Sequence, residues 1–397
     1  MTGKAITILG STGSIGQNTL AVLDANPGIE VFALTAKQNV EFLFAQCQKY
    51  HPRYVVVSDP DACARMQTLL QSSQLDTQLL QGEAALRQVA SAEDVGIVMA
   101  AIVGAAGLES TLAAVEAGKR VLLANKEALV MSGDLLMQAA ASSGAPIIPI
   151  DSEHNAIFQC LPQVADGLHR SQMRHVAKVV LTASGGPFLN FAAADLHNVT
   201  PEQACMHPKW DMGAKISVDS ATLMNKGLEF IEACYLFGLD SARVEVLIHP
   251  QSIVHSMVHF LDGSVLAQMG NPDMRIPISY GIGWPDRIAS GAATLDLAAQ
   301  PPLQFSLPDL DKFPCLRLGM EAAKVRGTAP AILNAANEVA VAAFLEGTIA
   351  FPSIPLIIEQ VVSKIPCEPA PSLAIIRDVD RQARNLANEL ITKDFCR

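Results

Sequence analysis

A glycine-rich turn between an apolar strand and a helix constrains the fold of this chain more than any other feature. The strand Ile6–Leu9 runs directly into the heptapeptide Gly10–Gly16 (GSTGSIG), and a helical pattern follows over Gln17–Asp24. Glycines at this spacing let the backbone approach a pyrophosphate, whose charge then rests on the positive N-terminus of the helix. The pattern is a relative of the fingerprint G-x-G-x-x-G, and its strand and helix flanks predict a dinucleotide site.

Short β-branched runs alternate with helical stretches through the first 150 residues. This alternation predicts an α/β fold that begins with a doubly wound, Rossmann-like domain, in which helices cover both faces of a parallel sheet. Ligands bind such sheets at the carboxyl ends of the strands, so polar residues just after the strands are the candidate site. The expected strands are Ile6–Leu9, Val31–Leu34, Tyr54–Val57, Ile97–Ala101, Val121–Leu123 and Ile147–Ile150.

The alternation stops at about residue 151, and two further domains are expected. The strands expected next are Val179–Thr182, Val244–Ile248 and Ile253–Phe260, with a helix over Ser220–Phe237; this mixture predicts a central α+β domain. Proline and glycine cluster between Asn271 and Pro314, which indicates an extended linker. We expect domains at 1–150, 151–285 and 312–397, with the linker at 286–311. The last is a C-terminal helical domain with expected helices at Leu316–Lys324, Ala329–Leu345, Ile354–Ser363 and Ser372–Ile391.

Charge and cysteine usage narrow the range of partners and locations. The 397 residues carry a formal net charge of −11 at pH 7, so nothing electrostatic favours nucleic acid or an anionic membrane. No stretch reads as a membrane span, and the first apolar stretch is too short for a signal peptide. Eight scattered cysteines with no Cys-x-x-Cys pair favour free thiols in a reducing cytoplasm.

The segment after the second strand indicates which dinucleotide binds. An NAD site usually ends this strand with a carboxylate that grips the ribose hydroxyls. Here Val31–Leu34 is followed by Thr35–Asn39 (TAKQN), with no carboxylate and one cation. This favours a ribose 2′-phosphate and hence NADP, the alternative being that Lys37 is an ordinary solvated lysine.

Three carboxylates suggest a site for a divalent cation. Asp151 and Glu153 follow the strand that ends at Ile150, and alternation along an extended chain would send both to the same side. Asn225 and Glu229 are four residues apart on one face of the expected helix. Carboxylates without a neighbouring cysteine or histidine cluster favour Mg²⁺ or Mn²⁺ over zinc, although Asp-x-Glu alone is as often a solvated turn.

Anion contacts and a lid complete the candidate site. Ser184-Gly185-Gly186-Pro187 offers a hydroxyl and free backbone amides, and the set Ser220, Asn225 and Lys226 offers contacts for a phosphate or polyol; singly, each is as readily a turn or helix cap. Cys205–Gly213 is irregular and aromatic, which is typical of a lid that excludes water. The histidines on strand-like runs are interpreted as structural: His249, His255 and His259.

Taken together, these segments resemble the 1-deoxy-D-xylulose 5-phosphate reductoisomerase family over essentially the whole chain. The resemblance implies NADPH, a divalent metal, a homodimer formed through the central catalytic domain, and a C-terminal helical domain. It implies that a metal-chelated ketose phosphate rearranges to an aldehyde, which NADPH reduces to 2-C-methyl-D-erythritol 4-phosphate for non-mevalonate isoprenoid precursors. The most specific pieces are Gly10–Gly16, Ala124–Ala128, Ile150–Asn155, Ser184–Phe188, His207–Gly213 and Ile216–Glu229.

The resemblance also implies roles for individual residues, with Lys126 and Glu153 as candidates for proton handling. Many members carry Gly-Lys-Asn where this chain has Lys37-Gln38-Asn39, so the cation has moved by one position. The metal ligands are Asp151, Glu153 and Glu229. The substrate contacts are Lys126, Ser152, Glu153, Ser184, His207, Ser220, Asn225, Lys226 and Glu229. The cofactor contacts that the resemblance implies are Thr12, Gly13, Ser14, Ile15, Asn39, Glu127 and Gly213. The positions of their segments add Lys37, Gln38 and Asn125 as candidate cofactor contacts.

Other functions stay open at the level of sequence. An acylating semialdehyde dehydrogenase needs a nucleophilic cysteine, and no cysteine stands beside the Asp151 or Asn225 segments, although Cys205 lies in the expected lid. A homoserine-type dehydrogenase would reduce an unrearranged substrate without a divalent metal. An NADP-sensing regulator would bind NADPH without turnover and would need no metal carboxylates.

Overall fold

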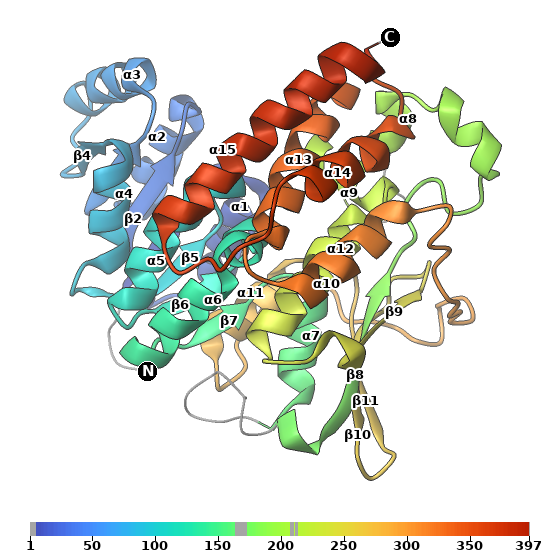
Figure 1. Ribbon diagram of the computed structural model, residues 1–397. Helices are drawn as coiled ribbons and strands as arrows, with labels where there is room; N and C mark the ends of the chain where they lie inside the picture. The colour runs from blue at the N-terminus through green and yellow to red at the C-terminus, as the bar shows by residue number, and fades with distance from the viewer. Residues whose placement is uncertain (1–4, 163–172, 207–209, 211–212, 397) are drawn as a thin grey trace.

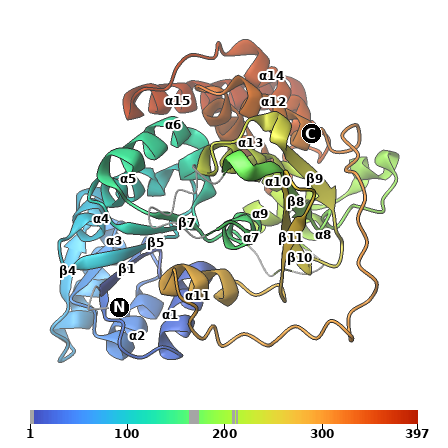
Figure 2. The same cartoon turned by 90° about the horizontal axis from the view of Figure 1, so that it is seen from below.

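A computed structural model describes residues 5–162, 173–206, 210 and 213–396 of the protein. Two sheets and a group of C-terminal helices make up this part of the chain (Figure 1). A second view shows the two sheets side by side, with the C-terminal helices lying across one end (Figure 2).

The first sheet is parallel, and its strand order is β4-β3-β2-β1-β5-β6-β7. The chain order reverses beside β1, which pairs with both β2 and β5; this is the switch point where doubly wound sheets bind ligands. The prediction of this fold class is confirmed. The strands are β1 Ala5–Leu9, β2 Val31–Ala36, β3 Tyr54–Val57, β4 Gln78–Gln81, β5 Val95–Ala100, β6 Arg120–Leu123 and β7 Ile147–Pro149.

Helices follow most of these strands, as the alternation predicts. Strand β4 was not anticipated, because its sequence Gln-Leu-Leu-Gln is short and its two glutamines are exposed at the edge of the sheet. The inner strands are almost wholly buried. The helices of this part are α1 Ser14–Asp24, α2 Val40–Tyr50, α3 Pro60–Gln71, α4 Gly82–Ser91, α5 Leu108–Glu116 and α6 Lys126–Ser143, with the short 3₁₀ turn η1 Gly104–Gly107.

The central part contains a mixed four-stranded sheet in the order β11-β10-β8-β9. Strands β8 and β9 are parallel, whereas β10 is antiparallel to both β8 and β11. The edge strand β11 was not anticipated from the sequence. The elements are β8 Val176–Ala183, β9 Val244–Ile248, β10 Val254–Phe260 and β11 Val265–Met269, with helices α7 Ser152–Cys160, α8 Pro201–Cys205, α9 Ala214–Ala221 and α10 Met224–Leu236 and the 3₁₀ turns η2 Met173–His175, η3 Ala193–Asn198 and η4 Ser241–Arg243.

Two local predictions for this part need correction. The single helix expected over Ser220–Phe237 is two helices, because the buried residue Leu223 adopts a left-handed conformation (φ 61°) between α9 and α10. The proline- and glycine-rich stretch between Asn271 and Pro314 is not extended throughout, because it contains helix α11, Arg275–Gly283, which packs on α1 and α7. This helix ends before the linker expected at 286–311. Pro277 is the third residue of α11, where a missing N–H costs nothing because the first-turn amides have no partner in the helix.

Four helices form the C-terminal part, as expected. They are α12 Pro314–Val325, α13 Ala329–Leu345, α14 Ser353–Lys364 and α15 Leu373–Leu390, followed by the short turn η5 Ile391–Phe395. Helix α12 packs on α10 and α13 packs on α6, so this part contacts both sheet-containing parts. Among the helices of the described residues, none combines the length and apolarity needed to cross a membrane.

Candidate active site

A pocket opens between the carboxyl ends of the first sheet and the helices of the central part. It encloses about 1140 Å³ of space, counting the portion open to solvent. The glycine-rich turn forms one wall, and helices α7, α9 and α10 form others. The predicted site residues that line it are Ser14, Ile15, Lys126, Asp151, Ser152, Glu153, Ser184, Gly213, Ser220, Asn225, Lys226 and Glu229.

The three predicted metal carboxylates converge in this pocket. Asp151, Glu153 and Glu229 each present an oxygen, and these oxygens lie within 4.8 Å of one another. The reason given from the sequence for the first two is wrong, since β7 ends at Pro149. Asp151 precedes α7 at its N-terminus and Glu153 lies in its first turn. An all-oxygen donor set of this kind fits Mg²⁺ or Mn²⁺.

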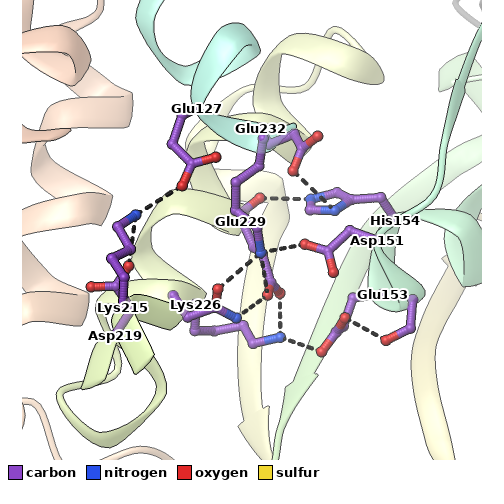
Figure 3. Close-up of polar contacts among 12 residues, drawn as sticks. Glu127, Asp151, Glu153, His154, Lys215, Asp219, Lys226, Glu229 and Glu232 are labelled. Carbon is purple, nitrogen blue, oxygen red and sulfur yellow. Dashed lines mark hydrogen bonds and ion pairs between the residues drawn. The ribbon is translucent and has the colours of Figure 1, made fainter. Parts of the chain in front are cut away.

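Two buried lysines, Lys126 and Lys226, lie among the carboxylates, and Figure 3 labels Lys226. Lys126 Nζ donates to Asn225 Oδ1 at 2.9 Å and to Glu229 Oε1 at 3.2 Å, and it pairs with Asp151. Lys226 Nζ donates to Glu153 Oε1 at 2.7 Å and pairs with Glu229. The spacing of four residues places Asn225 Nδ2 against the Glu229 carboxylate, as predicted. Buried charges of both signs thus neutralise one another within the pocket.

Burial and charge pull the pKa values of the carboxylates apart. Burial alone would raise the pKa of Glu153, but Lys226 and a hydrogen bond from Ser152 lower that pKa to about 2. Burial and the nearby charge of Glu153 raise the pKa of Glu229 to about 7. Burial lowers the pKa of Lys126, yet Asp151 and Glu229 outweigh burial and hold this pKa well above its ordinary value. Divergent pKa values within one pocket are typical of catalytic sites.

Behind the carboxylates lies a buried pair that the sequence analysis missed. His154 Nε2 is 2.8 Å from the backbone oxygen of Glu229, and His154 Nδ1 is 3.3 Å from Glu232 Oε2. Burial raises the pKa of Glu232 to about 7. Atoms of Asp151, His154 and Glu232 also lie within 4.8 Å of one another. The three-residue spacing between Glu229 and Glu232 was a signal that the two carboxylates share one side of the helix.

The glycine-rich turn has the steric character that its sequence predicts. Gly10 has φ 84°, and a Cβ there would lie 2.8 Å from the carbonyl oxygen of Ala101 at the end of the neighbouring strand β5. A Cβ on Gly16 would lie 2.4 Å from Ser11 Cα. Thr12 and Gly13 belong to the same turn, and Gly13 precedes α1 directly.

The predicted 2′-phosphate segment, Lys37-Gln38-Asn39, is exposed at the carboxyl end of β2. Gln38 Nε2 donates to Asp59 Oδ2 at 3.1 Å, and Arg65 Nη2 approaches the Gln38 carbonyl oxygen at 3.4 Å. Arg65 therefore supplies a second cation at this segment, which the sequence did not reveal because it comes from helix α3.

Two predicted cofactor residues, Asn125 and Glu127, are absent from the pocket lining that the described residues form. The Asn125 side chain accepts from the Ala128 amide at 3.2 Å and donates to the Gly104 carbonyl oxygen at 3.0 Å. Glu127 Oε1 accepts from Lys215 Nζ at 2.8 Å. Both side chains therefore hold the start of α6, next to Lys126.

The expected lid is described only in part, and His207 lies outside the described residues. Trp210 lines the pocket, and its ring centroid is 6.2 Å from that of His255. His255 lines the pocket too, and burial lowers its pKa; its interpretation as structural stays a prediction. His249 Nδ1 lies 2.8 Å from the Gln304 carbonyl oxygen, as a structural histidine should. Further pocket residues that the sequence analysis missed are Thr182, Leu223, Ser252 and Met274.

Comparison with known families gives one consistent result. The model described as 1-deoxy-D-xylulose 5-phosphate reductoisomerase matches residues 6–133, and the model for that family's C-terminal domain matches residues 147–237. A third model, described as the DXP reductoisomerase C-terminal domain, matches residues 269–386.

Individual proteins agree with the family models. The chain is 57% identical over 392 residues to the 1-deoxy-D-xylulose 5-phosphate reductoisomerase of Pseudomonas paraeruginosa, covering 98% of each chain. It is similar to a crystal structure of DOX-P reductoisomerase in complex with NADPH, fosmidomycin and magnesium, with 45% identity, a TM-score of 0.94 and 98% of each chain covered. It is also similar to the Zymomonas mobilis 1-deoxy-D-xylulose 5-phosphate reductoisomerase in complex with NADPH, with 42% identity, a TM-score of 0.91 and coverage of 99% and 100%.

Proposed function

The chain belongs to the 1-deoxy-D-xylulose 5-phosphate reductoisomerase family, and from that premise we propose which of its residues carry out the reaction. The enzyme is an NADP-dependent oxidoreductase that uses NADPH and a divalent metal to rearrange and reduce 1-deoxy-D-xylulose 5-phosphate to 2-C-methyl-D-erythritol 4-phosphate. This is a step in isoprenoid precursor biosynthesis. The observation that carries the assignment of residues is the convergence of three carboxylates in a pocket with the glycine-rich turn in its wall.

Asp151, Glu153 and Glu229 are the proposed metal ligands, since their oxygens lie within 4.8 Å of one another. A divalent cation held by these residues would supply Lewis-acid polarisation of the substrate carbonyl, and NADPH would supply the hydride. The ammonium groups of Lys126 and Lys226 lie against the same carboxylates. With the carboxylates engaged by a cation, both ammonium groups would be available to substrate oxygens.

The substrate phosphate is proposed to bind between the ends of β8 and α9. Ser184 follows β8, Ser220 lies on α9, and Asn225 and Lys226 begin α10; all four line one pocket. Hydroxyl, amide and ammonium donors together suit a phosphate dianion. Fixing the phosphate aligns the carbon skeleton with the carboxylates. Ser152 and, outside the described residues, His207 are the remaining proposed substrate contacts.

Lys126 and Glu153 are the proposed proton-handling groups. Nearby carboxylates raise the pKa of Lys126, so this lysine holds its proton and donates hydrogen bonds to substrate oxygens as negative charge develops. Despite burial, Lys226 and Ser152 lower the pKa of Glu153 to about 2, so this carboxylate is ionised at neutral pH. It becomes a stronger base, able to accept a hydroxyl proton, once its contact with Lys226 is lost. While Glu153 is ionised, Lys226 compensates its charge at 2.7 Å.

NADPH is proposed to bind along the carboxyl end of the first sheet. Its pyrophosphate would lie on Thr12–Ile15 at the N-terminus of α1, and its 2′-phosphate at Lys37–Asn39. The nicotinamide end would approach Asn125, Glu127 and Gly213, which begin α6 and α9.

We also propose a homodimer that forms through the central part, in the cytoplasm, with the domain boundaries expected from the sequence. Strand β11 is the edge of its sheet, and Val265 and Leu266 on it are 45% and 49% exposed. An exposed apolar edge strand is a surface on which a second copy can pair.

The deciding experiment follows the nicotinamide absorbance band with 1-deoxy-D-xylulose 5-phosphate as substrate. We expect NADPH oxidation that a chelator abolishes and Mg²⁺ or Mn²⁺ restores. Undiminished turnover in excess chelator would remove the metal from the mechanism. Tight NADPH binding without turnover under any metal condition would instead support a regulator.

A further inference from the structure

A buried polar chain joins three parts of the protein beside the pocket. It runs from Asn337 on α13 to Asp219 and Lys215 on α9 and ends at Glu127 on α6; Figure 3 shows the three charged members. Asn337 Nδ2 donates to Asp219 Oδ1 at 2.8 Å. Lys215 Nζ lies 2.9 Å from Asp219 Oδ2 and donates to Glu127 Oε1 at 2.8 Å.

Burial makes these contacts sensitive to the loss of any member. The side chain of Asp219 is 1% exposed and Asn337 is 0% exposed. A buried carboxylate without its partners is strongly unfavourable. Burial raises the pKa of Asp219 in spite of Lys215 and Asn337, whereas Lys215 outweighs burial and lowers the pKa of Glu127. These buried polar contacts therefore permit few other arrangements of α9 relative to α6 and α13.

The geometry of α9 connects these buried polar contacts to the pocket. Lys215 and Asp219 are four residues apart and share one side of the helix, whereas Ile216 and Ser220, one position further on, line the pocket. A rotation of α9 that released Asp219 would therefore turn Ser220 as well. At the other end of this set of contacts, Glu127 is adjacent in sequence to Lys126. Lys126 contacts Asp151, Asn225 and Glu229.

We propose that Glu127, Lys215, Asp219 and Asn337 form a positioning relay, which fixes the distance between the Lys126 side of the pocket and the Ser220 side. Asn337 does not line the pocket, so its effect on catalysis passes through Asp219. Lys215 is the central member, because its ammonium group bridges two carboxylates from different helices. The inference rests on the proposed function, since Glu127 also stands among the proposed NADPH contacts.

The test compares Lys215→Met, Lys215→Arg and Asn337→Leu with Ala342→Ser, an exposed control on the same helix as Asn337. Lys215→Met is expected to lower kcat by about tenfold or more and to raise the Kd for NADPH about tenfold, since sub-ångström placement of reacting groups controls the rate. Lys215→Arg should stay within about threefold of the wild type, because it keeps a cation between the two carboxylates. Asn337→Leu should lower kcat by about threefold to tenfold, and Ala342→Ser should change nothing.

Circular dichroism of each variant distinguishes a misfolded protein from a folded one whose pocket side chains are displaced. If Lys215→Met does not fold, the kcat of Asn337→Leu provides the test. A folded Lys215→Met with wild-type kcat and NADPH Kd would overturn the relay, as would Lys215→Arg that is as impaired as Lys215→Met. Failure of the proposed function would give a different result, because the wild type itself would bind NADPH without turnover. The Kd for NADPH in the variants would still test the relay in that case.

Discussion

Replacing Glu229 by Gln separates metal binding from stability, because it changes the charge balance of the pocket in a calculable way. Three carboxylates and two lysines face one another, so the group carries one net negative charge when all are ionised. The carboxylate oxygens lie within 4.8 Å of one another, so at an effective dielectric constant of about 20 each ionised pair repels by at least about 3.5 kcal/mol. Glu229→Gln removes two of the three repulsions together with the attractions of Glu229 to Lys126 and Lys226, and it leaves two carboxylates for two lysines.

The metal-free variant should therefore be about as stable as the wild type, within about 2 kcal/mol, since each lysine keeps one carboxylate partner. A cation would meet a neutral group instead of a negative one. For the wild type, Mg²⁺ at a hundredfold excess over its Kd stabilises the folded state by about 2.7 kcal/mol. With an unfolding entropy of about 2.1 cal/mol/K per residue, this raises the Tm by about 3 °C.

Differential scanning calorimetry with and without Mg²⁺ measures both quantities. Glu229→Gln should show less than about one-third of the wild-type rise in Tm at the same Mg²⁺ concentration. Glu321→Gln removes a carboxylate that pairs with Arg317 outside the pocket, and it should respond to Mg²⁺ as the wild type does. An equal rise in Glu229→Gln would refute the assignment of this residue as a ligand, and a large loss of metal-free stability would refute the charge-balance argument.

Other perturbations test separate parts of the site. Gly16→Ala places a Cβ 2.4 Å from backbone and should lower the Tm and the NADPH affinity. The Cβ of Gly13→Ala meets nothing closer than 3.5 Å, so this control should lower the Tm less. Equal Tm values for the two variants, measured without metal and cofactor, would contradict the steric reasoning. Because the pKa of Glu229 is raised to about 7, protons compete with Mg²⁺ below that pH. Mg²⁺ affinity measured by calorimetry should therefore fall from pH 8 to pH 6, and a flat profile would count against this. Burial and Glu202 raise the pKa of Cys205, so Cys205→Ser should keep activity within about twofold; an inactive variant would favour an acylating dehydrogenase.

Local sequence patterns were sufficient to predict most of the strands and helices and several site residues. The alternation of strands and helices predicts the parallel sheet, because each βαβ unit buries its apolar faces in only a few ways. The spacing of glycines predicts the turn between β1 and α1, and the four-residue spacing predicts the contact between Asn225 and Glu229. These features depend on backbone geometry over a few residues.

Contacts across the chain came only from tertiary packing. Nothing local indicated that Lys126 on α6 would reach Asp151 and Glu229, that α11 would pack on α1, or that His255 would face the pocket. Sequence spacing gives the direction of a side chain relative to its own element, but the element it meets is decided by which apolar faces bury together. The residue types and their local spacing therefore indicated the chemistry of the site. The pairing of lysines with carboxylates, and the depth at which they are buried, was decided by the fold.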